Sequence, residues 1–268
     1  MRNILALVFI GASISIFGSP VRSVVGYKHI SMSNGRGEVS YSAKDYVQDG
    51  LVAMWDGIEN VGWGIHDANT TTWIDLVGGR TFLLTHGVVT PNAVSVLGQM
   101  SSSKISYDTT KTYSVFHTCK FSNPTHTQAN VFTLLTTSTA FSVGAYSFDA
   151  NVPVRLFRAV NWKNVVTAST WPDNDIYAGQ FGITYSVLKS GESPKNIVVL
   201  YLDGVEVYRL EGESYSFGYA LRDSGNYYIN QSSSQLEQEV YNIRLYNREL
   251  TSDEIAANYE IDKVRFGL

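Results

Sequence analysis

One stretch of the chain combines aromatic side chains with short polar side chains, a combination suited to sugar recognition. Residues 161–180 read NWKNVVTASTWPDNDIYAGQ. The candidate ligand-binding residues are Trp162, Asn164, Trp171, Asp173, Asn174, Asp175 and Tyr177. Aromatic rings can stack on the C–H faces of sugars, while amide and carboxylate groups form hydrogen bonds to hydroxyl groups. The stretch therefore predicts a ligand-binding loop.

Asp173 and Asp175 could also bind Ca²⁺, because a hard cation prefers oxygen ligands. We expect no required cofactor, and calcium is the one ion that the sequence suggests. The alternative interpretation is an ordinary surface turn, in which Pro172, Asp173 and Asn174 are turn-forming residues. A second and smaller candidate is the Asn226-Tyr227-Tyr228 sequence.

Two residues could form a nucleophile and its base, since His117 and Cys119 fall on the same side of one predicted strand. That side is apolar, and a cysteine in such a place usually behaves as a small buried hydrophobe. The sequence contains neither a G-x-S-x-G nor an H-E-x-x-H motif. We therefore expect no catalytic residues and predict that the chain is not an enzyme.

Three tryptophans, Trp55, Trp63 and Trp73, lie close together in the sequence. They could form a stacking platform for a ligand. The favoured interpretation is structural, because Trp55 falls in a probable strand and the other two could fix the following loop to the core.

The composition narrows the range of partners. The net charge is −4 and the basic residues are not clustered, which argues against nucleic acid as a partner. Charged residues make up only 16% of the chain, so Ser, Thr, Asn, Gln and Tyr must cover much of the surface. The single cysteine, Cys119, excludes a disulfide within the chain.

Alternating apolar and polar residues predict antiparallel strands that are buried on one face. The alternation is clear in residues 112–121, 181–187 and 241–246. Residues 197–209 (IVVLYLDGVEVYR) predict a hairpin, because Asp203-Gly204 can adopt the positive φ angles of a type I′ turn. Near the C-terminus, Thr251 and Glu254 have the spacing of a helix capping box. The fold class is therefore all-β with a short C-terminal helix.

The chain divides into three predicted segments. Residues 1–20 contain Arg2 and then a mostly apolar stretch from Ile4 to Phe17, and two interpretations remain open: a signal peptide or an arm that docks on a partner protein. Residues 21–44 are expected to form a linker or extended arm. Residues 45–268 are expected to form one domain.

Two segments carry a resemblance to a known family. They are residues 46–79, which contain DGLVAMWDG, and residues 240–266, which contain IRLYNREL followed by SDEIAANY. With the LYLDG hairpin, they resemble the laminin-G-like, concanavalin A-like jelly rolls of gut-bacterial surface proteins and bacteriophages. The resemblance implies an antiparallel β-sandwich (a jelly roll) in which the first and last strands pair.

The same superfamily includes glycoside hydrolases with an E-x-D-x-x-E strand motif, whose retaining members need two carboxylates about 5–5.5 Å apart. The nearest sequence here runs from Glu260 to Arg265, and Arg265 occupies the place of the final carboxylate. A glycoside hydrolase is therefore the weakest of the functional hypotheses.

The first hypothesis is a non-catalytic module that recognises glycans or a host cell surface, displayed on a virion or a bacterial surface. The second is a structural virion component, a fibre or decoration protein, which residues 1–44 would anchor to capsid or tail proteins. Both imply an extracellular, cell-surface or virion location, and the chain could form a homo-oligomer.

Overall fold

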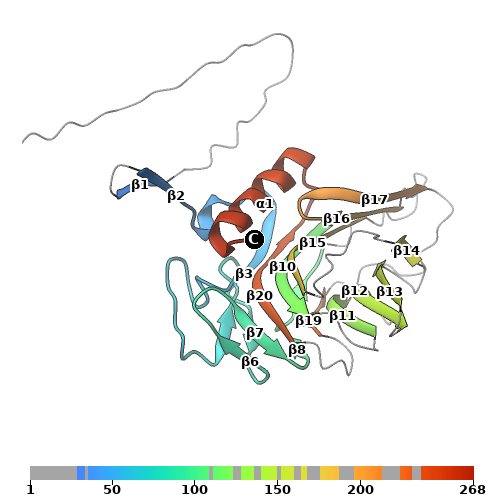
Figure 1. The fold of residues 1–268 in the computed structure, drawn as a ribbon, viewed down its shortest axis with the longest axis horizontal. Helices are drawn as coiled ribbons and strands as arrows, with labels where there is room; N and C mark the ends of the chain where they lie inside the picture. The colour runs from blue at the N-terminus through green and yellow to red at the C-terminus, as the bar shows by residue number, and fades with distance from the viewer. Residues whose placement is uncertain are drawn as a thin grey trace, which may run out of the picture.

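The computed structural model describes the backbone of residues 29–33, 36–108, 111–122, 128–135, 140–149, 152–159, 164–167, 176–186, 196–212, 224–230 and 237–268. Side chains are described for residues 40–108, 111–121, 178–184, 199–209, 224–230 and 237–268. Most of this structure consists of antiparallel strands, and a helix, α1 (Ser252–Phe266), ends the chain (Figure 1). The all-β prediction with a C-terminal helix is therefore confirmed.

The larger sheet has eight strands. In order they are β17 (Val205–Gly212), β16 (Asn196–Leu202), β15 (Ile176–Ser186), β10 (Tyr113–Ser122), β20 (Glu237–Tyr246), β7 (Val94–Leu97) and β6 (Gly87–Val89). The eighth strand, β3 (Leu51–Asp56), pairs with the second half of β20, while β7 pairs with its first half. The first and last long strands of the domain thus lie side by side, as the resemblance implied.

The smaller sheet has six strands. In order they are β14 (Asn164–Thr167), β13 (Val152–Ala159), β12 (Ala140–Asp149), β11 (Gln128–Leu135), β19 (Tyr227–Ile229) and β8 (Met100–Ser101). The short pairs are β1 (His29–Ser33) with β2 (Arg36–Ser40), β4 (Thr72–Ile74) with β5 (Thr81–Leu83), and β9 (Ile105–Ser106) with β18 (Ser224–Gly225). The β1–β2 pair falls within residues 21–44, where the sequence suggested no regular element.

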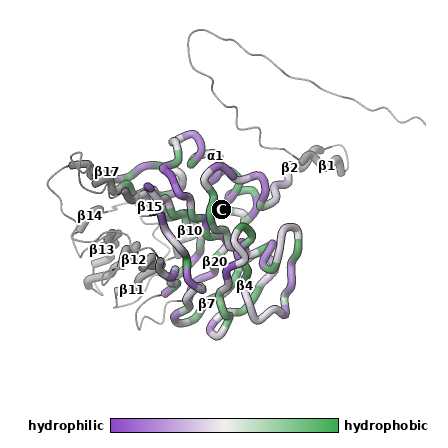
Figure 2. The backbone as a smooth tube through the Cα atoms, turned by 180° about the vertical axis from the view of Figure 1, so that it is seen from behind, coloured by the Kyte–Doolittle hydropathy of each residue, from purple (hydrophilic) through white to green (hydrophobic). Residues whose placement is uncertain are grey.

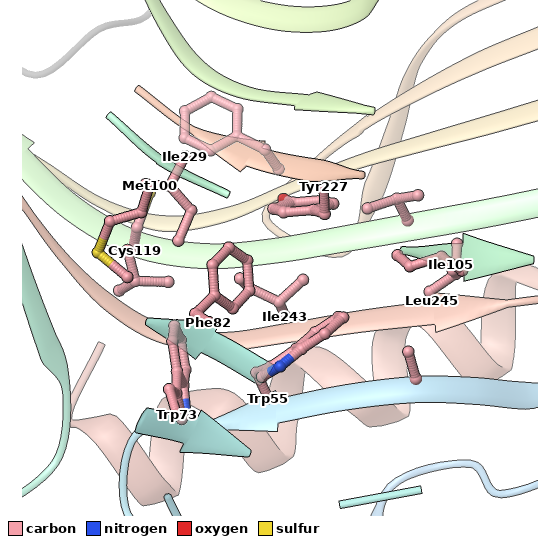
Figure 3. Packing of buried hydrophobic residues seen from close by; sticks show 14 of the residues in the cluster. Trp55, Trp73, Phe82, Met100, Ile105, Cys119, Tyr227, Ile229, Ile243 and Leu245 are labelled. Carbon is pink, nitrogen blue, oxygen red and sulfur yellow. The ribbon is translucent and has the colours of Figure 1, made fainter. Parts of the chain in front are cut away.

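The main hydrophobic core joins residues of both large sheets. Met100, Tyr227 and Ile229 of the smaller sheet belong to the same buried cluster as Val115 and Ile243 of the larger one. Figure 3 shows Met100, Tyr227 and Ile243 converging with two tryptophans and Phe82. In Figure 2 hydrophobic and hydrophilic stretches alternate along the tube, as expected of strands that bury one face.

The predicted hairpin is confirmed. Strands β16 and β17 are joined by Asp203 and Gly204, whose φ angles are +51° and +78°. Both values lie in the left-handed region that a type I′ turn requires. A side chain at Gly204 would also meet the Tyr259 ring of α1, so the turn packs closely against the helix.

A β-bulge changes which residues of β20 face the core. Thr118 pairs with Asn242, whereas Cys119 pairs with Val240, so Tyr241 is an extra residue in β20. Gln238 and Val240 face the main core before the bulge, and Ile243 and Leu245 face it afterwards. The bulge therefore turns Asn242, Arg244 and Tyr246 toward the other face of the sheet.

Helix α1 covers that other face, which we call the outer face. Phe116, Tyr201 and Tyr246 of the sheet form a second hydrophobic cluster with Ile255 and Ile261 of the helix. This cluster explains why Phe116 interrupts the polar side of its strand. The capping box is present as predicted, since Thr251 and Glu254 each accept a hydrogen bond from the other's backbone N–H. Within the described part of the chain, no helix has the length and apolar character needed to cross a membrane.

The free edge of β3 is occupied by side chains and a short segment of backbone. The Met54 N–H donates to Asp75 Oδ1 over 2.8 Å, and the Leu76 N–H donates to the Met54 carbonyl over 2.7 Å. Arg80 Nη1 donates to the Val52 carbonyl and to Asp75 Oδ2. Three main-chain groups on this edge of β3 are therefore bonded within the chain: the Met54 N–H, the Met54 carbonyl and the Val52 carbonyl.

Candidate functional site

The predicted ligand-binding stretch connects the two large sheets. Asn164 begins β14 of the smaller sheet, in register with Arg158 of β13. Tyr177 lies in β15 of the larger sheet, in register with Phe121 of β10. Trp162, Trp171, Asp173, Asn174 and Asp175 lie outside the described residues. The ligand site and the Ca²⁺ site at Asp173 and Asp175 therefore stay predictions.

An exposed ion pair of the larger sheet lies in register with Ala178, whereas Tyr177 is in register with the buried Phe121. Lys120 Nζ lies 3.7 Å from Glu239 Oε2, and the two side chains are 43% and 42% exposed. Lys120 is in register with Ala178 of β15, the residue after Tyr177.

His117 and Cys119 are buried in the main core. Burial lowers the pKa of His117 to about 4 and raises the pKa of the Cys119 thiol well above its usual value. Both groups are therefore uncharged at neutral pH, and the thiol is not activated as a nucleophile. The two ring nitrogens of His117 are bonded to Tyr227 Oη over 2.8 Å and to Gln238 Oε1 over 3.1 Å.

The two acidic residues of the 260–265 sequence, which lies in α1, have different environments. Glu260 pairs with Lys263 on the surface, whereas Asp262 is buried against the sheet. The Asp262 carboxylate accepts from Tyr46 Oη over 2.6 Å and from Arg244 Nη2 over 2.6 Å. It also accepts hydrogen bonds from Thr118 and Gln180.

The Arg244 guanidinium lies 4.2 Å from the centre of the Tyr46 ring, so the cation also stacks on an aromatic face. Burial, reinforced by the charge of Asp262, raises the pKa of Tyr46 well above its usual value. The phenol therefore stays protonated and donates to Asp262. We call Arg244, Asp262, Tyr46, Thr118 and Gln180 the helix cluster.

A second ion pair fixes the C-terminal turn of α1. Arg265 Nη1 and Nη2 bond to Asp56 Oδ2 and Oδ1 over 2.6 and 3.0 Å. Arg265 also reaches Glu59, whose carboxylate accepts from the backbone N–H groups of Ala43 and Gly64. Helix α1, the residues before β3 and the loop after β3 are thus joined in one network.

The three tryptophans have the structural role that the sequence favoured. Trp55 and Trp73 are 0% exposed and pack around Phe82 in the main core. Trp63 is partly buried and packs against the hydrophobic cluster beneath α1. Lys44 Nζ lies 5.9 Å from the centre of its ring. The second candidate sequence, 226–228, is likewise anchored, because Tyr227 is 1% exposed.

No local pattern in the sequence indicates the helix cluster. Tyr46 and Asp262 are separated by 216 positions in the chain. One local signal exists, because Arg244 is a charged residue between two apolar residues of a buried strand. Among the residues with described side chains, no three of the His, Cys, Asp and Glu residues are grouped to hold a metal ion.

No family model and no curated protein matches the chain. Its fold is similar to solved structures of Trypanosoma rangeli sialidase. The complex with a difluoro-KDN compound matches with a TM-score of 0.55 and 16% identity, over 87% of this chain and 35% of the sialidase. The complex with sialic acid matches with a TM-score of 0.54 and 16% identity, over 90% and 37%.

A botulinum neurotoxin serotype G binding domain also matches, with a TM-score of 0.48 and 11% identity, over 80% of this chain and 51% of the domain. The chain spans about a third of the length of the sialidases. At these identities the sialidase comparisons show a similar fold and nothing more.

The comparisons correct one prediction. We expected that the chain is not an enzyme, yet the solved structures with which it shares its fold include sialidases, which are enzymes. The expectation relied on the absence of familiar catalytic motifs. Such motifs are local in sequence, whereas catalytic groups can come together from distant strands, so their absence was a poor guide.

Proposed function

We propose that residues 45–268 form a glycan-binding domain of the concanavalin A-like, laminin-G-like jelly-roll type. A single hydrophobic core joins the eight-stranded and six-stranded sheets, which supports the sandwich architecture. The pairing of β3 with β20 supports the family resemblance.

The observation that carries the proposal is the place of residues 161–180 in the topology. They include β14, the edge strand of the smaller sheet, and the start of β15, an inner strand of the larger sheet, so the chain passes from one sheet to the other within this stretch. Segments that connect the strands of a rigid β-scaffold commonly carry binding residues. The aromatic and acidic composition of this loop fits a sugar, with Ca²⁺ as an optional ion.

One solved sialidase with a similar fold holds sialic acid. This similarity favours including sialylated glycans among the ligands to be tested. The proposal places the protein outside the cell, on a cell surface or on a virion, where glycans are accessible.

The test is a glycan array with sialylated and neutral glycans, probed in the presence of calcium and in the presence of EDTA. Trp171→Ala should reduce binding at least tenfold, because it removes a stacking face worth about 1.4 kcal/mol or more. Asp173→Asn should have its main effect in the calcium arm. Leu83→Ala is the control, since Leu83 is a 62% exposed apolar residue on another strand.

Circular dichroism and melting curves establish that each variant is folded before binding is compared. Mass spectrometry of the bound glycans reveals any cleavage, which separates binding alone from binding with turnover. An array without any bound glycan, or equal binding by Trp171→Ala and Leu83→Ala, would contradict the proposed site.

A further inference from the structure

A chain of hydrogen bonds crosses the main core and joins the two sheets. Tyr227 of β19 bonds to His117 Nδ1 of β10 over 2.8 Å, and His117 Nε2 bonds to Gln238 Oε1 of β20 over 3.1 Å. Gln238 Nε2 continues to Asn230 Oδ1 over 2.6 Å, and Asn230 Nδ2 ends at the Gly98 carbonyl over 3.2 Å. We call this series the core chain.

The far end of the core chain fixes the direction of every bond. The Gly98 carbonyl can only accept, so the Asn230 amide must present its NH₂ there and its oxygen to Gln238. Gln238 then donates with its NH₂ and must accept with its oxygen. His117 therefore carries its proton on Nε2, and its Nδ1 lone pair accepts from the Tyr227 hydroxyl. This arrangement requires a neutral imidazole.

The described groups that face the ring are uncharged. Tyr227 and Cys119 have pKa values raised well above their usual values, mainly by burial, and Gln238 cannot titrate. The cross-strand residues in register with His117 are Phe181 of β15 and Ile243 of β20, which are apolar. The charge of Asp203 further raises the pKa of Cys119, and Tyr107 further raises the pKa of Tyr227.

We propose that the core chain makes the contact between the two sheets acid-sensitive, so that protonation of His117 loosens the folded domain. A proton on Nδ1 would face the hydroxyl that now donates to that atom, so the Tyr227 bond would have to reverse. The new positive charge would also lie in a core that contains Trp55, Phe82 and Tyr227. This device does not depend on whether the domain binds glycans.

The sign of the effect follows from linkage. Burial lowers the pKa of His117 to about 4 in the folded state, below its ordinary value of 6.5. The unfolded chain therefore binds more protons than the folded one between these values, so stability falls as the pH falls from 6.5 toward 4. The unfolding equilibrium constant should rise about 30-fold between pH 7.5 and pH 5 from this residue.

The experiment is urea unfolding of the full chain at several pH values between 7.5 and 4.5, for the natural protein and His117→Gln. A glutamine side chain can donate and accept as His117 does, but it cannot be protonated in this range. We expect the unfolding equilibrium constant of the variant to rise about 30-fold less than that of the natural protein between pH 7.5 and pH 5. His86→Gln is the control, because it makes the same substitution at an exposed histidine.

Equal pH dependence in the natural protein and His117→Gln would overturn the proposal. If His117→Gln does not fold, an NMR titration of the His117 Cε1 resonance in the natural protein decides the question. A ring that stays neutral at pH 5 supports the proposal, and titration at the ordinary value of 6.5 overturns it.

Discussion

The two faces of the eight-stranded sheet hold their buried polar groups in different ways. On the outer face, the helix cluster contains a charged pair, Arg244 and Asp262, whose side chains are both 0% exposed. On the inner face, the core chain contains only neutral donors and acceptors. Both sets are buried to a similar degree, so burial alone does not decide which kind of group a site holds.

The difference lies in how many partners each group has. Asp262 accepts from four side chains, which offsets much of the energy of removing its charge from water. A neutral hydroxyl, amide or imidazole loses less hydration than a charge, so the groups of the core chain need less compensation. In this protein, the neutral groups form a series of hydrogen bonds between the two sheets, whereas four donors surround one carboxylate beneath the helix.

The largest expected effect comes from breaking the charged pair. Asp262→Ala leaves the Arg244 cation buried without its carboxylate and removes the acceptor of Tyr46. We expect a loss of about 3–5 kcal/mol in the free energy of unfolding, measured by urea denaturation at neutral pH. Glu260→Ala is the control on the same helix, since Glu260 is 65% exposed and pairs only at the surface. A loss below about 1 kcal/mol for Asp262→Ala would show that the pair is dispensable.

A smaller effect is expected from the neutral core chain. Gln238→Leu keeps most of the side-chain volume but leaves His117 Nε2 and Asn230 Oδ1 without the partner that each now has. We expect a loss of about 2–3 kcal/mol in the same assay. Glu237→Ala, on the exposed preceding residue, is the matched control. If Gln238→Leu were as harmful as Asp262→Ala, the distinction between charged and neutral networks would fail.

The smallest effect is expected at the start of α1. Thr251→Ala removes the hydroxyl that accepts the Glu254 N–H and should reduce the free energy of unfolding by about 1 kcal/mol. Ser252→Ala, one position later, should change it little. Comparing the losses of Thr251→Ala and Asp262→Ala shows how much of the stability comes from the helix cap and how much from the helix cluster. If Thr251→Ala caused the larger loss in the free energy of unfolding, the helix cap would matter more than the helix cluster, contrary to our expectation.

The fold was predictable where a local rule decides the structure. Asp203-Gly204 gave the hairpin because few residue pairs tolerate two positive φ angles, and Thr251 with Glu254 gave the helix start because the cap is formed within four residues. The pairing of β3 with β20 came from the family resemblance instead. No local pattern joins strands so far apart in the sequence.

The polar networks were not predictable for the same reason. Their members come from distant parts of the chain, and the bulge at Tyr241 reverses the faces of β20 midway, which simple alternation cannot anticipate. Phe116 is an apolar residue on the polar side of its strand, and its apolar partners come from α1, which lies far away in the sequence. For the ligand site, Asn164 and Tyr177 are placed in strands of different sheets, and the other five predicted residues stay predictions.

The bonded edge of β3 has a consequence for the behaviour of the protein at high concentration. A strand with free main-chain groups can accept a strand from another copy, which is how β-rich proteins begin to form fibrils. On β3, Asp75 binds the Met54 N–H and Arg80 binds the Val52 carbonyl, and the Asp75–Arg80 ion pair also places charge there. The two side chains therefore act as a built-in barrier to aggregation along this border, in addition to fixing the loop that carries them.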